Sequence, residues 1–216
     1  MLSDIIHTNK FVGLFSHIWF LAEGIYSDEI RNWKYFRHLS NEDFFQLLTK
    51  WDIDDSASFL SQTAWLLSEG YRAEFNKLSA KINTFPYETR AKYASTAPFS
   101  KQEQDKIYAV MKYQDCIGPC GILAYDYITY IALLYIGNTL NIINSQQYTT
   151  KSAEAAKVLQ KSYSSWDECL IACIAGSLFQ GSEQYYNSFE ISQEDYIKVL
   201  AILHSKSSMP WNSKLK

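Results

Sequence analysis

The sequence predicts an all-α protein, a single compact bundle of roughly eight to ten helices over residues 1–216. Three observations carry this prediction. Residues that cap helices precede several amphipathic runs, apolar residues recur inside those runs at helical spacing, and strand signals are weak. Apolar residues make up 47% of the chain and charged residues 20%, which is typical of a globular domain and not of a disordered chain.

Several helix starts are predicted from capping boxes. In this motif a serine side chain caps the free amides of the first turn, and an acid three residues later bonds back to the serine amide. Each box in this chain precedes an amphipathic run, so each marks a helix start. The boxes pair Ser40 with Asp43, Ser100 with Glu103, Ser165 with Glu168, and Ser192 with Asp195.

Other elements follow from spacing and from helix breakers. Residues 83–100, which contain Pro86 and Pro98, are predicted to be a loop that could hinge two halves, 1–95 and 100–216. Gly118 and Pro119 are expected to end one helix before another over residues 123–140. Residues 85–87 and 142–143 are too short or proline-broken for a sheet. One helix is predicted over residues 58–75, with one face formed by Phe59, Leu60, Thr63, Leu66, Leu67 and Gly70.

Aromatic residues make up 16% of the chain, with 16 Tyr, 12 Phe and 6 Trp. We expect most of these rings to pack between helices in the core. The alternative is that part of the tyrosine lies on the surface as contact residues, because amphipathic rings suit protein interfaces. Both interpretations stay open at this point.

The formal net charge is −3 and the isoelectric point is near 5.8. No dense run of Lys and Arg is present, so direct binding of nucleic acid is not expected. A mildly acidic, aromatic surface suits a basic protein partner better. The first residues lack the basic start and apolar segment of a signal peptide, and no apolar run is long enough to span a bilayer. We therefore expect a cytoplasmic protein without a membrane partner.

Metal, cofactor and nucleophile motifs are not found in the sequence. Cys116 with Cys120, and Cys169 with Cys173, are spaced four apart, which suits neither an intrahelical disulfide nor a zinc site. Cys169 and Cys173 lie in an apolar run and are predicted to be buried thiols. The four histidines include no pair at metal-binding helical spacing, and no phosphate-binding loop occurs. No metal and no cofactor is predicted.

Carboxylates are the remaining candidates for chemistry. Asp52, Asp54 and Asp55 could form a metal or acid–base cluster, but we favour helix capping, because they directly precede the helix predicted to start near residue 58. Asp126 lies among aromatic residues in an apolar helix, so we expect it to be at least partly buried. Its partner is predicted to be a Tyr hydroxyl or a Trp indole, and its role to be structural.

Two groups of motifs resemble a bacterial family, domain of unknown function 1266. The first contains Trp51-Asp-Ile and continues from Trp65-Leu-Leu-Ser-Glu-Gly-Tyr-Arg to Phe75. The second contains Ala124-Tyr-Asp126, a segment ending in Ser-Ser-Trp166-Asp-Glu, and a closing Ser208-Met-Pro-Trp211-Asn. The resemblance covers roughly residues 45 to 212. The resemblance implies a structural role for Trp51, Trp65, Gly70, Arg72, Asp126, Trp166, Gly176 and Trp211.

The chain departs from the family pattern at three charged positions. Tyr71 stands where members usually carry His, and Thr129 and Tyr135 stand where they usually carry Arg. These departures would disable most charge-based mechanisms, whereas a binding scaffold would tolerate them. We therefore do not expect an enzyme.

The resemblance also suggests a function, because some relatives occur beside bacterial competition systems and small acidic proteins of this type resemble immunity proteins. The chain is thus expected to be a monomer when free and to neutralise a cognate toxin, a basic nuclease (RNase) domain, by blocking its active site. The alternative is a small-ligand-binding protein or enzyme with a pocket near Trp51, Arg72, Asp126 and Trp166. Candidate toxin contacts are Asp28, Glu29, Asp52, Asp54, Asp55, Glu183, Tyr185 and Tyr186.

Overall fold

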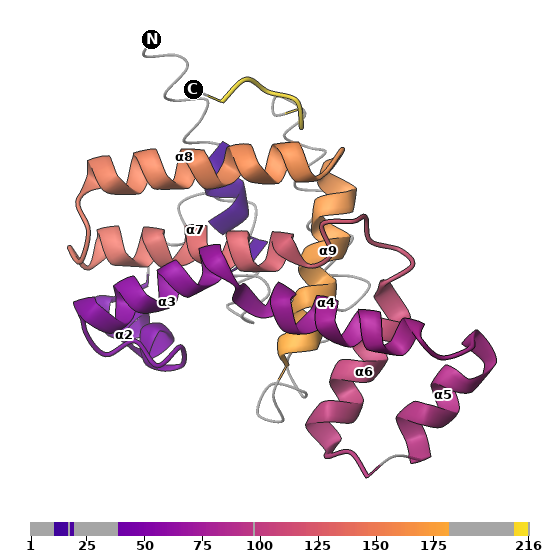
Figure 1. The fold of residues 1–216 in the computed structure, drawn as a ribbon. Coiled ribbons are helices and arrows are strands. Elements are labelled where there is room, and N and C mark those ends of the chain that lie inside the picture. Colours follow the sequence, from indigo (N-terminus) through magenta and orange to yellow (C-terminus); the bar gives the residue numbers. More distant parts are fainter. Residues whose placement is uncertain (1–10, 17, 20–38, 97, 182–209, 216) are drawn as a thin grey trace.

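The computed structural model describes residues 11–16, 18–19, 39–96, 98–181 and 210–215 (Figure 1). Within this part of the chain the secondary structure is helical and no β-strand occurs, so the predicted all-α bundle is confirmed. Residues 11–16, 18 and 19 are helical. The helices that follow are α2 (Asn41–Thr49), α3 (Ser56–Ser68), α4 (Gly70–Asn83), α5 (Tyr87–Thr96), α6 (Lys101–Tyr113), α7 (Leu123–Thr139), α8 (Ser145–Ser162) and α9 (Trp166–Gln180).

Helix α7 is the centre of the bundle. It packs against α2, α3, α4, α8 and α9, and α8 runs alongside it while α9 crosses one of its ends (Figure 1). Twelve of its 17 residues are buried, which explains why its sequence is apolar on nearly every side. Helices α4 and α6 pack together, α6 also contacts α9, and α5 packs on α6 at the edge of the molecule.

Two glycines allow α7 to approach its neighbours closely. A Cβ atom built on Gly176 of α9 would lie 2.2 Å from the Cβ of Tyr125, and one built on Gly137 would lie 2.5 Å from the ring of Phe59. Larger residues at these positions would push α9 and α3 away from α7. Gly176, one of the residues for which the family resemblance implies a structural role, therefore has a packing role.

Local capping explains most helix starts. Ser40 and Ser100 form the predicted capping boxes with Asp43 and Glu103. Ser165 caps the amide of Glu168, but the Glu168 carboxylate accepts from Ser164 and not from the cap residue, so that box is only half formed. Ser192 and Asp195 lie outside the described residues. Two further boxes were not predicted, Asp55 with Ser58 and Asn144 with Gln147.

Two predicted elements are wrong. Residues 58–75 do not form one helix, because α3 ends at Ser68 and α4 begins at Gly70 with a positive φ of 58°. Leu60 and Leu67, predicted to share one face with Phe59 and Leu66, are 54% and 37% exposed, whereas Phe59 and Leu66 are buried. The predicted loop over residues 83–100 contains α5, whose helical structure is stabilised by packing on α6. The predicted break before α7 is confirmed.

None of the helices in the described part of the chain combines the length and the apolar character that crossing a bilayer would require.

Candidate functional site

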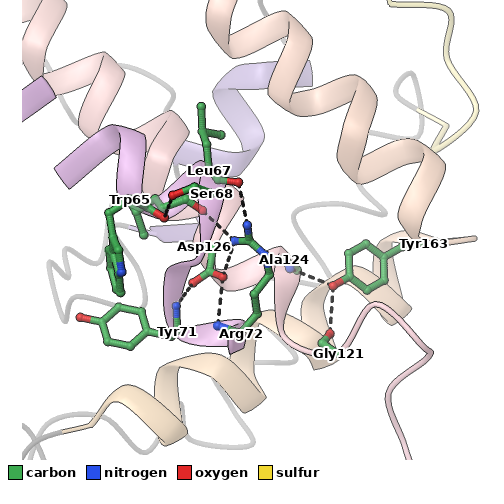
Figure 2. Close-up of polar contacts among 10 residues, drawn as sticks. Trp65, Leu67, Ser68, Tyr71, Arg72, Gly121, Ala124, Asp126 and Tyr163 are labelled. Carbon is green, nitrogen blue, oxygen red and sulfur yellow. Dashed lines mark hydrogen bonds and ion pairs between the residues drawn. The ribbon is translucent and has the colours of Figure 1, made fainter. Parts of the chain in front are cut away.

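Asp126 lies in the first turn of α7 and its side chain is completely buried. Its Oδ1 accepts a hydrogen bond from the Tyr71 amide at 2.9 Å, and its Oδ2 accepts one from the Arg72 amide at 3.2 Å (Figure 2). These amides belong to the first turn of α4, where no earlier residue in the same helix can accept their protons. Asp126 therefore caps α4 from a different helix, and no side chain at the N-cap position of α4 does so.

Arg72 connects the same carboxylate to the end of α3. Its Nη1 donates to Asp126 Oδ2 at 2.8 Å and to the Leu66 carbonyl at 2.7 Å, and its Nη2 donates to the Leu67 carbonyl at 2.7 Å (Figure 2). The carbonyls at a helix C-terminus lack partners within the helix and carry partial negative charge, so a guanidinium suits them. Asp126 and Arg72 thus join the end of α3, the start of α4 and the start of α7.

Gly70 provides the space for this arrangement. A Cβ atom at residue 70 would lie 2.2 Å from Asp126 Oδ2 and 2.8 Å from Arg72 Nη1. The positive φ of Gly70 also turns the chain between α3 and α4 without the strain that another L-residue would bring. Glycine is required here for conformation and for volume.

Burial raises the pKa of Asp126 from its usual value near 3.8 to about 6, although the hydrogen bonds from Arg72 and from the two amides act in the opposite direction. A carboxyl with such a pKa could in principle transfer protons. In this structure, however, both oxygens already accept from protein donors and the side chain is closed to solvent. The arrangement holds helices together and leaves no open position for a substrate.

The predicted partner of Asp126 is therefore wrong. Its partners are a guanidinium and two backbone amides, and not a Tyr hydroxyl or a Trp indole. A buried Tyr hydroxyl does bond to the backbone at the start of α7. Tyr163 Oη accepts from the Ala124 amide at 2.8 Å and donates to the Gly121 carbonyl at 3.0 Å (Figure 2). The sequence carried no signal for this contact, because Tyr163 lies 39 residues from Ala124.

Aromatic rings surround the start of α4. Tyr71, at the position of the family histidine, packs edge-on against Trp65 with ring centroids 4.9 Å apart. Its ring also contacts Trp51 at 6.2 Å and Tyr125 at 5.7 Å. Trp51 is buried and Trp65 half-buried. This cluster packs around the helix ends that Asp126 joins, and its ring contacts are those of a core.

Trp166 belongs to a second aromatic cluster. It packs against Phe11, Phe15 and Trp211, with ring centroids 4.8 to 5.1 Å away. The indole of Trp211 donates to the Tyr163 carbonyl at 2.8 Å, which fastens the segment 210–215 to the end of α8. The four residues of the predicted pocket therefore fall into two groups, one with Trp51, Arg72 and Asp126 and one with Trp166.

The other departures from the family pattern also lie inside the bundle. Thr129 is fully buried, and Tyr135 is half-buried with its ring against Phe44 and Tyr148. Cys169 and Cys173 are buried thiols, as predicted, and burial raises the pKa of Cys173 to about 12. Among the residues that the structure describes, no three His, Cys, Asp or Glu side chains are grouped to hold a metal ion.

The acidic candidates lie at the surface between α2 and α3. Asp52 and Asp54 are exposed, and Asp55 is exposed while its carboxylate accepts from Ser58 as the cap of α3. Capping is thus confirmed for Asp55. Hydrogen bonds from Ser58 also lower the pKa of Asp55. The other predicted contacts, Asp28, Glu29, Glu183, Tyr185 and Tyr186, lie outside the described residues.

Sequence reasoning missed an apolar strip on α3. Leu60, Ala64 and Leu67 follow one another at spacings of four and three, and all three are exposed, so they share one outward face. We call these residues the α3 face. Residues 41–69, which include it, contain six Asp and Glu and one Lys, a formal charge of −5 in a chain whose total is −3. The acidic excess of the chain therefore lies in α2 and in the residues that directly precede and follow α3.

A family model described as "Protein of unknown function (DUF1266)" matches residues 46–215. No curated protein and no solved structure matches the chain.

Proposed function

The chain belongs to the DUF1266 family, and on that premise we propose that it is an immunity protein. In this proposal it binds a cognate bacterial toxin domain of the nuclease (RNase) type and neutralises it by covering the active site. It acts in the cytoplasm, as a monomer when free, and it uses the α3 face with the acids around it. The observation that carries the proposal is the combination of exposed leucines and a charge of −5 within residues 41–69.

Charge supports a basic partner. A nuclease that binds RNA needs cationic residues to replace the counterions of the phosphate backbone. An acidic surface complements such a site, increases the rate of encounter and orients the two proteins. Glu42 of α2, Asp52 and Asp54 between α2 and α3, and Glu69 at the end of α3 are exposed.

Apolar exposure supports tight binding. Leu60 and Leu67 are 54% and 37% exposed in the free protein, so a partner that covers them removes apolar surface from water. Phe45 of α2 is also 52% exposed. Interfaces commonly place apolar anchors inside a polar rim, and the acids before and after α3 would form such a rim.

The interior supports binding over catalysis. Asp126 and Arg72 are the charged residues that the family motifs share, and here both are engaged in joining helix ends. A rigid scaffold of this kind holds an interaction surface in a fixed shape, which lowers the entropy lost on association.

The test uses the C-terminal domain encoded by the gene next to this one. We expect a 1:1 complex in size-exclusion chromatography and loss of RNA cleavage by that domain when the chain is added. Leu60→Lys should weaken the complex by roughly 30-fold, the effect of losing a central interface anchor. Tyr87→Lys, a similar change at an exposed residue of α5, is the matched control and should leave binding unchanged.

Two results would count against the proposal. If the neighbouring domain neither binds the chain nor stops cleaving RNA in its presence, the immunity role is wrong. If Leu60→Lys binds as well as the unaltered chain while Tyr87→Lys does not, the role stands but the α3 face is not the contact surface.

A further inference from the structure

The helices α4 to α6 carry charge of the opposite sign to the α3 face. Residues 73–113, which we call the α4–α6 lobe, contain seven Lys and Arg and four Asp and Glu, a formal charge of +3. Arg72, just before the lobe, is excluded because Asp126 neutralises it in the interior. In Figure 1 the lobe extends to one side of α7, with α5 at its outer edge. The net charge of the whole chain therefore conceals two regions of opposite sign.

Lysines on all three helices of the lobe face solvent. Lys77 and Lys81 of α4, Lys92 of α5 and Lys112 of α6 are exposed.

Three of the four acids in the lobe are engaged, and the fourth, Glu88 of α5, is exposed. Glu74 pairs with Lys106 at 2.6 Å, and Asp105 pairs with Lys101 at 2.9 Å. Glu103 accepts from the amide of Ser100 in its capping box. The two ion pairs cancel two cations and two anions, so the charge of +3 comes from Lys77, Lys81, Arg90, Lys92 and Lys112 against Glu88 and Glu103.

The lobe also exposes two tyrosine rings. Tyr87, at the start of α5, is 75% exposed, and Tyr108 of α6 is 46% exposed. The Arg90 guanidinium lies 5.7 Å from the centre of the Tyr87 ring, and Lys81 lies 5.9 Å from that of Tyr93. Tyr93 is half-buried, so of these two contacts it is the Arg90 contact that places positive charge beside an exposed ring.

We propose that the α4–α6 lobe binds single-stranded nucleic acid. Lysines on α4, α5 and α6 would contact the phosphate backbone, and the exposed rings of Tyr87 and Tyr108 would stack with bases. Stacking is what favours this ligand: unpaired bases offer flat faces to exposed rings, whereas duplex bases are already stacked. A purely acidic polypeptide would pair with the lysines but has no flat rings to stack on the two exposed tyrosines. The proposal does not depend on the immunity role. It departs from the expectation drawn from the sequence, because the lysines lie on three packed helices and not in one dense run.

The test measures fluorescence anisotropy of a labelled oligouridine of about 12 nucleotides, a length within the usual range of single-strand sites. With about four phosphates neutralised, the slope of log K against log salt should be about −3. Affinity should then fall roughly 50-fold between about 50 and about 200 mM salt. Tyr87→Ala should weaken binding by roughly tenfold through lost stacking.

Charge variants show where the ligand binds. Lys81→Glu combined with Lys92→Glu should abolish binding, because it reverses the charge on two helices of the lobe. Lys161→Glu on α8 makes the same kind of change at an exposed lysine outside the lobe and should have little effect. Leu60→Lys, the variant that tests the immunity role, should bind the oligonucleotide normally. Thermal melts followed by circular dichroism show that each variant is folded.

Three outcomes would overturn the proposal. The first is no binding of the oligonucleotide at low salt. The second is equal loss of affinity for Lys161→Glu and for the double lobe variant, which would indicate general charge attraction. The third is competition by polyglutamate that matches unlabelled oligouridine, together with no effect of Tyr87→Ala, which would identify the lobe as a site for acidic polypeptides instead.

Discussion

Arg72 and Asp126 are 54 residues apart in the sequence, and their side chains meet at 2.8 Å inside the bundle. Asp126 caps the first turn of α4, while Arg72 donates to the last carbonyls of α3. The two side chains therefore stabilise a sharp break between consecutive helices and fasten that break to α7. Removing either partner leaves buried polar groups without a counterpart, and this leads to the first prediction.

Arg72→Met should lower the free energy of unfolding by about 3 kcal/mol or more, because Asp126 would remain buried without its cation. Urea denaturation followed by circular dichroism measures this change. If Arg72→Met costs less than about 1 kcal/mol, the pair does not stabilise the bundle in this way. In the Asp126→Asn background the same substitution should cost at least about 1 kcal/mol less, since the buried charge is then absent.

Gly70→Ala should destabilise the protein by about 3 kcal/mol. The added Cβ would lie 2.2 Å from Asp126 Oδ2, and the residue would keep a φ of 58° that alanine disfavours. Gly181→Ala is the matched control, because Gly181 has a φ of −47° and the nearest atom to its added Cβ is a carbonyl oxygen at 3.4 Å. The control should change stability by less than about 0.5 kcal/mol. Similar losses for both variants would show that the contact with Asp126 is unimportant.

Stability should depend on pH through Asp126. Its pKa is about 6 in the folded protein and near 3.8 in the unfolded chain, so between these values the folded state binds more protons. The contribution of Asp126 is thus fully present below about pH 4 and is lost as pH rises through about 6. The loss is at most about 3 kcal/mol.

The contribution is isolated by subtracting the unfolding free energy of Asp126→Asn from that of the unaltered protein at each pH. The pKa values of Asp43 and Glu103 are lowered by hydrogen bonds from Ser40 and Ser100, so these two acids make the protein more stable as pH rises. Both proteins contain them, and their effect cancels in the difference. The difference should fall as pH rises from about 4 to about 6. A difference that rises over this interval would mean that Arg72 outweighs burial and lowers the pKa.

Tyr163→Phe should cost about 2 kcal/mol, because the buried Ala124 amide and Gly121 carbonyl would both lose their partner. Tyr108→Phe also removes a tyrosine hydroxyl, but from a side chain that is 46% exposed, so it should hardly change the free energy of unfolding. Thermal or urea unfolding compares the two. Equal effects would imply that the Tyr163 hydroxyl does not support the start of α7.

Several helix starts were predictable because the cap and its partner are near in sequence, although the equally local boxes of Asp55 with Ser58 and of Asn144 with Gln147 were missed. Ser40 and Asp43, three residues apart, form their box within one turn, and so do Ser100 and Glu103. The apolar sequence of α7 likewise indicated a buried helix, since a helix without a polar face has no side to turn toward water. These features depend on local geometry and on composition, which a sequence displays directly.

The sequence by itself thus determined that the chain is helical, where several of its helices begin, and that Asp126 is buried. Only the tertiary structure decided that Arg72 is its partner, that the chain breaks at Gly70, and that Trp166 packs apart from Trp51. It also decided that Leu60 faces outward. The reason is physical: hydrogen bonds within a helical turn form between near neighbours, whereas the pairing of Asp126 with Arg72 requires α4 and α7 to be packed together first.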